Sequence, residues 1–346
     1  MSATLRIARA ELIEQARRPA PGDAFGEQVL SAVRRMVPFD GYCLIGLDPC
    51  TGMRSFMFSR NGLDGMAARL AMNEAVEHDA HRYLDLARAA VPVGVLNVTE
   101  RSRLPSPRLH EILRPAGFSS ELRLVLRGSG RVWGALVLFR SDRRRSFTEQ
   151  DRASAIALAE PLGDAVRRYP LRRCVRSPES LPPGVVVLDE RNAVIATSDE
   201  AHAWLDDLRV GGRDEMRFED VLRVVYDIGL AVQFGDHRAA SSPQCRIRTA
   251  SGRWLMVHGT RTADAPGRVA VILQPAAVSQ VLPAVAAWLR LTPRETQVLA
   301  LVSRGLAAKE MARELQLSVL TLNDHLASIF CKAGVSGRHE LMATLT

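Results

Sequence analysis

The last 56 residues of the chain, 291–346, constrain the fold more than any other stretch, because their pattern is helical throughout and contains clear signals for helix starts and ends. Thr292 precedes Pro293 and stands three residues before Glu295, which is the arrangement of a capping box at a helix start. Gly305 then supplies a residue that readily takes the left-handed conformation in which many helices end. The stretch is therefore expected to be an all-α domain of four short helices.

A tight turn separates the second and third of these helices. The second helix follows Ala307, which is a weak N-cap, and Ser318 is a good cap for the third, expected over 319–332. Gly334 ends the third helix, and Ser336 is expected to cap the fourth. Two helices joined in this way form a helix-turn-helix, which places the second helix of the pair in the major groove of DNA.

The third helix has two faces of different character. Apolar residues at helical spacing predict its buried face: Leu322, Leu326, Ile329 and Phe330. The opposite face carries short polar or small side chains: Asn323, Asp324, Ala327, Ser328 and Cys331. Asparagine pairs with adenine and aspartate accepts from cytosine, so this face is a candidate for reading base edges. The alternative is a small helical bundle whose polar face is merely solvated.

The same domain matches one known family in register over its whole length. The matching residues are Leu291, Thr292, Arg294, Glu295, Val298, Leu299, Gly305, Lys309, Glu310, Ala312, Leu315, Leu317, Ser318, Thr321, His325, Leu326, Ile329, Lys332, Gly334, Val335, Arg338, Glu340 and Leu341. They resemble the LuxR-type helix-turn-helix family of bacterial transcription regulators, and this resemblance implies a DNA-binding domain.

The resemblance also implies roles for single residues. It places five side chains at or near the phosphate backbone: Lys309, Thr321, His325, Lys332 and Arg338. It places three at base edges: Asn323, Asp324 and Ala327. Ser318, at the start of the third helix, and Ser328, on its polar face, complete the predicted DNA-binding set.

The net charge of +8 does not come from this domain. Residues 291–346 contain six Lys or Arg and five Asp or Glu, whereas residues 101–176 contain 17 arginines and seven acidic residues. Neutralisation of phosphates supplies most non-specific affinity for DNA, so a nearly neutral domain is expected to bind weakly as a single copy. Dimerisation would offset this weakness by making the second contact intramolecular.

Residues 1–170 predict a mixed α/β unit. Helices are expected over 5–18, 24–36 and 63–89, and strands over 41–48, 53–59, 121–127 and 132–140. Thr148 then caps a long helix that ends near residue 168. This order of elements, together with the closing stretch 147–166, resembles a GAF domain, and the whole chain resembles actinobacterial GAF-containing LuxR-type regulators.

A second, smaller module is expected over 182–275, after a polar and basic linker at 171–181. Its pattern predicts two strands within 184–198, helices over 199–208 and 218–232, and strands over 244–249, 253–261 and 268–274. This order resembles a PAS domain. Residues 276–290 are expected to form a connector helix, so the whole chain is predicted to be α+β.

Both module types often enclose a small ligand between the sheet and the helices. The candidate lining residues in the first module are Tyr42, Phe56, Phe58, His78, Tyr83 and Trp133. In the second module they are Trp204, Phe234, Trp254 and His258. Plain core packing is the alternative for each of them, because aromatic residues on strands usually fit a packed, half-buried surface.

Several protein classes are not expected. The chain has no nucleophile elbow, phosphate-binding loop or zinc-peptidase motif, so neither an enzyme nor a cofactor is predicted. The five cysteines have no metal-binding or disulfide spacing, and the His78–His81 pair is more typical of a solvated helix face than of a metal site. Neither a transmembrane stretch nor a signal peptide is evident, so a cytoplasmic protein without a membrane partner is expected.

Two functional hypotheses follow from the sequence. In the first, a small-molecule effector binds the GAF-like or PAS-like module and shifts the placement of two DNA-binding domains within a homodimer. In the second, the two modules only dimerise or bind a protein partner, without a small ligand. Both hypotheses predict a transcription regulator that binds double-stranded promoter DNA, and a contact with RNA polymerase is compatible with either.

Overall fold

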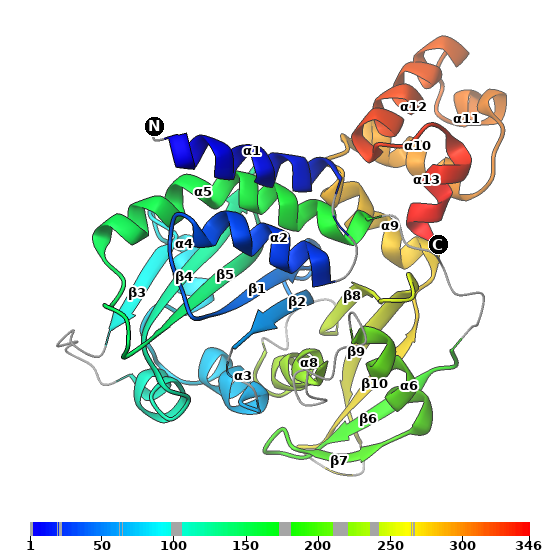
Figure 1. The fold of residues 1–346 in the computed structure, drawn as a ribbon. Helices are drawn as coiled ribbons and strands as arrows, with labels where there is room; N and C mark the ends of the chain where they lie inside the picture. Colours follow the sequence, from blue (N-terminus) through cyan, green and yellow to red (C-terminus); the bar gives the residue numbers. More distant parts are fainter. Residues whose placement is uncertain are drawn as a thin grey trace.

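The computed structural model of the protein describes residues 3–18, 20, 23–61, 63, 65–97, 106–172, 181–209, 221–235, 242–263, 265 and 267–346. In these residues, two five-stranded antiparallel sheets lie beside one another, and each has helices packed against it (Figure 1). An all-helical domain at the C-terminus projects beyond both sheets. The mixed helix and sheet architecture predicted from the sequence is therefore confirmed.

The first sheet has the strand order β2-β1-β5-β4-β3, and all neighbouring strands are antiparallel. Its strands are β1 (Gly41–Leu47), β2 (Arg54–Arg60), β3 (Val93–Asn97), β4 (Phe118–Gly128) and β5 (Arg131–Ser141). The long hairpin of β4 and β5 depends on its turn, where Ser129 and Gly130 both take a positive φ, as a tight hairpin turn requires.

Helices cover both faces of this sheet. One face packs against α2 (Asp23–Arg34) and α5 (Glu149–Arg168), and α1 (Ala3–Arg17) packs on these two helices, so that together they form one apolar core. The other face carries α3 (Ala67–Ala75), α4 (Tyr83–Arg88) and the π-helical turn η1 (Arg108–Leu113). The expected cap of α5 is confirmed, because Thr148 accepts from the backbone N–H of Asp151.

The expectation of one helix over 63–89 is wrong, because the chain turns between α3 and α4. Asp79 accepts from the backbone N–H of the next residue, Ala80, at 2.7 Å, and such local side-chain bonds compete with a helix. His81 has a φ of 58°, which lies outside the helical region. The strand β3 and the turn η1 were not predicted from the sequence.

The second sheet has the order β7-β6-β10-β9-β8. Its spatial strand order, counted along the chain, is therefore the same as in the first sheet. Its strands are β6 (Gly184–Leu188), β7 (Val194–Thr197), β8 (Gln244–Arg248), β9 (Trp254–Arg261) and β10 (Val269–Pro275). Its helices are α6 (Asp199–Leu208) and α8 (Arg223–Phe234). Gly259 of β9 lets α8 approach, since a Cβ there would lie 2.6 Å from the side chain of Ile228.

The two sheet modules are held together by buried polar contacts. Asp48 accepts from both the backbone N–H and the guanidinium of Arg246, at 3.0 and 2.7 Å. Arg54 of β2 donates to Asp227 of α8 at 2.8 Å, and Ser55 donates to the Arg246 carbonyl at 2.7 Å. Residues 173–180 of the predicted linker and 210–220 before α8 lie outside the described residues.

The C-terminal part consists of α9 (Val278–Trp288), α10 (Pro293–Ser303), α11 (Ala308–Glu314), α12 (Val319–Ala333) and α13 (Arg338–Leu345). The predicted capping box of Thr292 and Glu295 is present, and Gly305 and Gly334 take the expected positive φ. The predicted Ser336 cap is wrong. Gly337 is the N-cap of α13, and Ser336 instead donates its N–H to Glu340.

The C-terminal domain shares its core with the connector and with both sheet modules. Trp288 of α9 stacks on Trp254 of β9 with ring centroids 5.6 Å apart, and Trp133 of β5 belongs to the same apolar cluster. Trp254 also donates its indole N–H to the Thr344 carbonyl at 3.0 Å. The last turn of α13 is therefore tied to the second sheet.

Candidate functional site

The exposed side of α12 is the most complete candidate site in the described residues. Leu322, Leu326 and Ile329 are buried and anchor the helix on the rest of its domain, as their spacing predicted. The opposite side is open to solvent with the rest of the protein in place and carries Asn323, Asp324, Ala327 and Cys331. Figure 1 shows α12 in the part of the domain that projects beyond the sheets.

Local bonds set the position of α12. The Ser318 hydroxyl accepts from the backbone N–H of Thr321 at 3.0 Å, which starts the helix. Before it, Leu317 donates its N–H to the Ala312 carbonyl at 2.8 Å, which closes the end of α11. Gly334 ends α12 with a φ of 67°. The sequence therefore produces a helix-turn-helix in which the second helix has a free outer face.

Glu295 is a buried carboxylate beneath that helix. It accepts from the Lys332 ammonium at 2.8 and 2.6 Å, from the Ser328 hydroxyl at 2.6 Å and from the backbone N–H of Thr292 at 2.7 Å. Burial alone would raise the pKa of Glu295, but these hydrogen bonds outweigh it and lower the pKa to about 2. The carboxylate is thus ionised at neutral pH and ties α10 to α12.

This arrangement turns two predicted DNA-binding residues, both half-buried, toward Glu295. Ser328 and Lys332 bond Glu295, and the predicted contacts of Lys332 with the phosphate backbone and of Ser328 with DNA stay predictions. Lys309 is exposed at the start of α11, and Thr321 is exposed on α12. His325 is half-buried, and Arg338 is half-buried with its guanidinium 3.3 Å from the Met311 sulfur.

The open face of α12 lacks a free cation. The charged residues of this helix are Asp324, which is exposed, and Lys332, which is paired with Glu295. Leu320, by contrast, is 74% exposed beside Thr321, and sequence reasoning missed it. The available signal in the sequence was the position of Leu320 directly before Thr321, a predicted DNA contact. An exposed leucine of this kind can make apolar contact with a thymine methyl group.

The six ligand-lining candidates of the first module do not meet around one cavity. Tyr42, Phe56 and Phe58 pack in the core beneath α2 and α5, whereas Tyr83 lies on the other face of the sheet. His78 is exposed. Trp133 packs with the connector and C-terminal domain, and it donates to the Gly128 carbonyl at 3.1 Å. Their role in ligand binding stays a prediction.

In the second module the aromatic candidates are also dispersed. Trp204 is buried and donates to the Pro182 carbonyl at 2.8 Å, while Phe234 is exposed. Trp254 faces the C-terminal domain, as described above. His258 is half-buried, and burial lowers the pKa of its imidazole.

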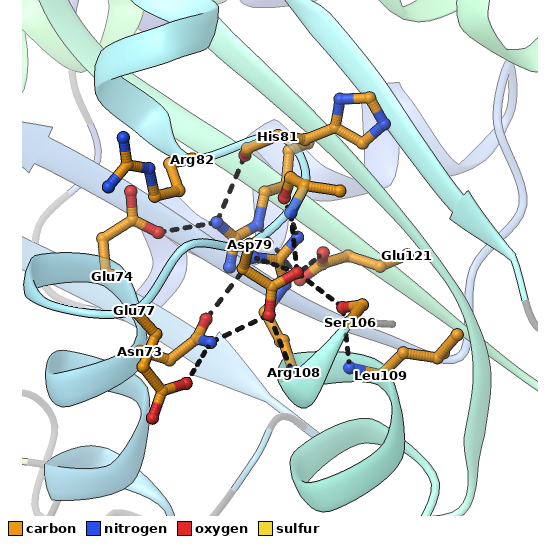
Figure 2. A network of polar contacts seen from close by, with 12 residues as sticks. Asn73, Glu74, Glu77, Asp79, His81, Arg82, Ser106, Arg108, Leu109 and Glu121 are labelled. Atoms are coloured by element: carbon orange, nitrogen blue, oxygen red, sulfur yellow. Dashed lines mark hydrogen bonds and ion pairs between the residues drawn. The ribbon is translucent and has the colours of Figure 1, made fainter. Parts of the chain in front are cut away.

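A network of charged side chains fills the space between the first sheet and its second helical layer (Figure 2). Arg108 is completely buried and donates to Glu121 at 2.9 Å and to the Ala80 carbonyl at 2.6 Å. Arg123 donates to Glu74 at 2.7 Å, and its Nε lies 3.1 Å from the other oxygen of Glu121. The two strand residues Glu121 and Arg123 thus point from β4 to the helices.

Asp79 organises the other half of this network. Its two oxygens accept from the hydroxyl of Ser106 at 2.6 Å, the amide of Asn73 at 2.9 Å and the backbone N–H of Arg108 at 2.8 Å. Burial would raise the pKa of Asp79, but the bonds from Ser106, Arg108 and Asn73 lower it. The alternation of Glu121 and Arg123 with leucines in β4 was the only local signal for the network.

Two cavities lie near these features. The first, of about 70 Å³, lies between the two sheet modules, and Phe56, Phe58 and Tyr169 are among its lining residues. The second, of about 30 Å³, borders the buried network at Glu121 and Arg123. A single water needs roughly 10–15 Å³ in this measure, so the second cavity has room for only about two or three waters.

The described residues bring together no group of three or more His, Cys, Asp or Glu side chains that could hold a metal ion. His81, one of the two histidines considered in the sequence, has its ring 3.1 Å from the Val95 carbonyl. None of the described helices combines the length and the apolar character needed to cross a membrane.

The family comparison agrees with the geometry of the C-terminal domain. Residues 289–345 match the model of the family described as bacterial regulatory proteins, luxR family. Response regulator Rre1 of Synechocystis sp. is 45% identical over 51 residues, which are 15% of this chain and 22% of Rre1. A protein of Mycobacterium bovis, named as an HTH-type transcriptional regulator, is 40% identical over 55 residues, which are 16% of this chain and 6% of that protein.

The chain therefore spans less than a quarter of either relative. Among solved structures, SdiA of Escherichia coli aligns with 97% of this chain and 94% of its own, at 11% identity and a TM-score of 0.31. That TM-score is too low to establish a shared overall fold. Residues 289–345, in contrast, combine the observed helix-turn-helix with similarity to the luxR family of bacterial regulatory proteins.

Proposed function

We propose that the protein is a transcription regulator that binds double-stranded promoter DNA through α12. The observation that carries this proposal is the open face of Asn323, Asp324 and Ala327 on a helix whose other face is fully anchored. A helix of this kind fits the major groove, where asparagine and aspartate side chains discriminate between base edges. The luxR-family match of the same segment supports the proposal.

We further propose that the protein binds DNA as a homodimer. The C-terminal domain is nearly neutral, and in α12 the single lysine is occupied by Glu295. Phosphate contacts supply most non-specific affinity, so one copy of such a domain binds weakly. Two linked copies raise the local concentration of the second domain at its half-site, which restores affinity without new contacts.

A ligand-sensing role for the sheet modules is the remaining part of the proposal. The strand succession of both modules supports a GAF-like and a PAS-like assignment, and the 70 Å³ cavity offers space between them. For the first module alone, the buried network of Arg108, Glu121 and Arg123 favours the hypothesis without a small ligand, because charged side chains occupy the interior of that module. That hypothesis assigns the modules to dimerisation or partner binding.

DNA binding is tested by fluorescence anisotropy with the full chain, on fragments upstream of its own coding sequence and on a randomised library. The expected result is a preferred sequence with two related half-sites, bound in a strongly salt-dependent manner. Absence of any preferred sequence at low ionic strength, with the protein shown to be dimeric, would overturn the proposal.

A further inference from the structure

Part of the second sheet turns an aliphatic face away from its own helices. Side chains alternate along β6 and β10, so that Val186, Leu188 and Val271 are buried against α6 and α8. The residues between them point to the opposite face, and the pairing of the strands places six of them side by side. These six form the outer patch: Val185, Val187, Ala196, His258, Ala270 and Ile272.

The outer patch begins where the connector and the last helix end. Trp254 lies four residues before His258 on the same face of β9, and it packs on Trp288 of α9. Met256, between them on this face, is buried. Val185 at the other end is 37% exposed, and Ala196 on the edge strand β7 is exposed as well. One end of the face is therefore covered by the protein itself and the other is open.

The outer patch has no charge at neutral pH. Five of its six side chains are aliphatic, and the sixth is the imidazole of His258. Burial lowers the pKa of His258 below its ordinary value of 6.5, so the neutral form prevails at pH 7. The solvated face of an antiparallel sheet normally carries polar side chains at these alternating positions. An aliphatic patch in their place indicates a surface that another macromolecule covers.

Charge decides between the possible occupants. The net charge of +8 opposes the approach of a second copy in general. The outer patch is an exception, because two copies of an uncharged surface bring no like charges together. Nucleic acid is bound mainly through cationic side chains, which the six residues of the patch lack. The occupant that fits the outer patch is therefore a second copy of this chain.

We propose that the outer patch is the dimer interface of the protein, packed on the same patch of a second copy around a two-fold axis. Each copy removes the aliphatic side chains of the other from water. The proposal rests on the homodimer part of the proposed function and gives that dimer a location.

This location connects dimerisation to the DNA-binding domain. Trp254, on the same face of β9 as His258, donates to the Thr344 carbonyl in the last turn of α13. A copy on the outer patch therefore lies beside the attachment of the DNA-binding domain. Dimerisation at this face sets the spacing of the two DNA-binding domains through β9 and α9.

Sedimentation velocity of the full chain, without DNA, tests the interface. The wild type is expected to form a reversible dimer. Val185→Glu and Val185→Lys each introduce two like charges into the interface, so each is expected to raise the dissociation constant of the dimer about tenfold or more. An equimolar mixture of the two variants is expected to form a mixed dimer, because each copy then carries a charge opposite to that of its partner.

The mixture distinguishes contact between identical patches from other arrangements. If each variant separates the copies but the mixture stays monomeric, the outer patch does not pack on itself and the proposal is overturned. A wild type that is monomeric at every measurable concentration also overturns it. Ala196→Glu, on the exposed edge strand, provides the answer if the variants of Val185 do not fold.

Ile156→Glu is the matched control. Ile156 is 38% exposed on α5 of the first module, close to the 37% of Val185, and lies outside the outer patch. Its replacement is expected to leave the dissociation constant unchanged. Separation of the copies by Ile156→Glu, with an intact dimer in Val185→Glu and Ala196→Glu, would place the interface on the first module and contradict the proposal.

The outcome is separate from that of the DNA experiment. A dimer that Val185→Glu separates, but that has no preferred DNA sequence, removes the proposed regulator function and leaves the interface intact. A monomer that binds promoter DNA with sequence preference removes the interface and leaves the DNA-binding function intact.

Discussion

The Lys332 ammonium lies 2.6 Å from one carboxylate oxygen of Glu295, and this ion pair joins the third helix of the DNA-binding domain to the first. The same carboxylate caps α10 through Thr292 and accepts from Ser328. One buried acid therefore sets both the start of α10 and the rotation of α12. The rotation of α12 decides which side chains are presented on its open face.

Replacement of Glu295 is expected to destabilise the C-terminal domain. Glu295→Gln removes a buried carboxylate that bonds Lys332, Ser328 and Thr292, and the expected loss is about 2–4 kcal/mol in the free energy of unfolding. Urea denaturation of the full chain measures the loss. Glu310→Gln is the matched control, because Glu310 bonds only the exposed N-cap of α11 and its replacement is expected to cost about 1 kcal/mol or less.

The same carboxylate makes the stability depend on pH in the acid range. The folded-state pKa of Glu295 is about 2, below its ordinary value of 4.5. A lowered pKa stabilises the fold above the ordinary value, and that contribution is lost as the pH falls from about 4.5 towards 2. The free energies of unfolding of wild type and Glu295→Gln should therefore converge as the pH falls through this range. A difference between them that stays constant down to pH 2 contradicts the assignment.

The two lysines of the chain are expected to behave differently. Lys309 is exposed, so Lys309→Ala should weaken binding to all DNA sequences and reduce the slope of log K against log salt by about 1. Lys332→Ala leaves the buried Glu295 unpaired, so its first effect should be on the urea midpoint. Anisotropy titrations from low to moderate salt test this, and an unchanged slope for Lys309→Ala excludes Lys309 from the phosphate contacts.

Asn323 is expected to determine base preference. It is exposed at the centre of the open face, where its amide can pair bidentately with adenine. Asn323→Ala should therefore lose about 1–3 kcal/mol at the preferred site and relax selection at one base position, with little effect on non-specific binding. Selection from a randomised library measures this, with Cys331→Ala, further along the same face, as the comparison. Identical preferences of wild type and Asn323→Ala remove Asn323 from the reading set.

The local signals of the sequence predicted the DNA-binding domain well. Thr292, Ser318 and Gly334 mark helix ends by bonds within a few residues, and these positions were confirmed. The Ser336 prediction failed because the adjacent Gly337, with an extended backbone, takes the N-cap position of α13. Where a feature depends only on neighbours in the chain, a pattern of residue types is sufficient to find it.

The long-range features could not be found in this way. Trp133 is a strand aromatic like Phe58, yet the two lie in different cores, and the core of Trp133 includes residues more than 100 positions away. Glu121 and Arg123 pair with residues from α3 and η1 that show no distinctive spacing. The inward rotation of Lys332 follows from Glu295, which lies 37 positions earlier and was recognised only as a cap.

The buried network of the first module should be sensitive to the loss of one member. Arg108→Met leaves Asp79 and Glu121 buried without their main cation, and the expected cost is about 3–5 kcal/mol in the stability of this module. Urea denaturation measures the change. Arg82→Met is the control, since its partner Asp85 is exposed and such surface pairs contribute about 1 kcal/mol or less. A similar small loss in both variants would show that the network is dispensable.

The attachment of α13 to the second sheet is expected to depend on Trp254. Its indole N–H donates to the Thr344 carbonyl at 3.0 Å, while its ring stacks on Trp288. Trp254→Phe keeps an aromatic ring in place but removes the hydrogen-bond donor. The free energy of local opening of α13 should therefore fall by about 1 kcal/mol. Hydrogen exchange should therefore become several-fold faster in residues 341–345 and stay unchanged in β6.

Trp204→Phe is the matched control, because Trp204 also donates to a carbonyl, that of Pro182, within the second module. It should accelerate exchange near β6 and leave α13 unaffected. If both variants accelerate exchange in α13 equally, the C-terminal domain is loosened by general destabilisation of the second module. If only Trp254→Phe does so, the hydrogen bond from Trp254 to Thr344 fixes the last helix of the DNA-binding domain.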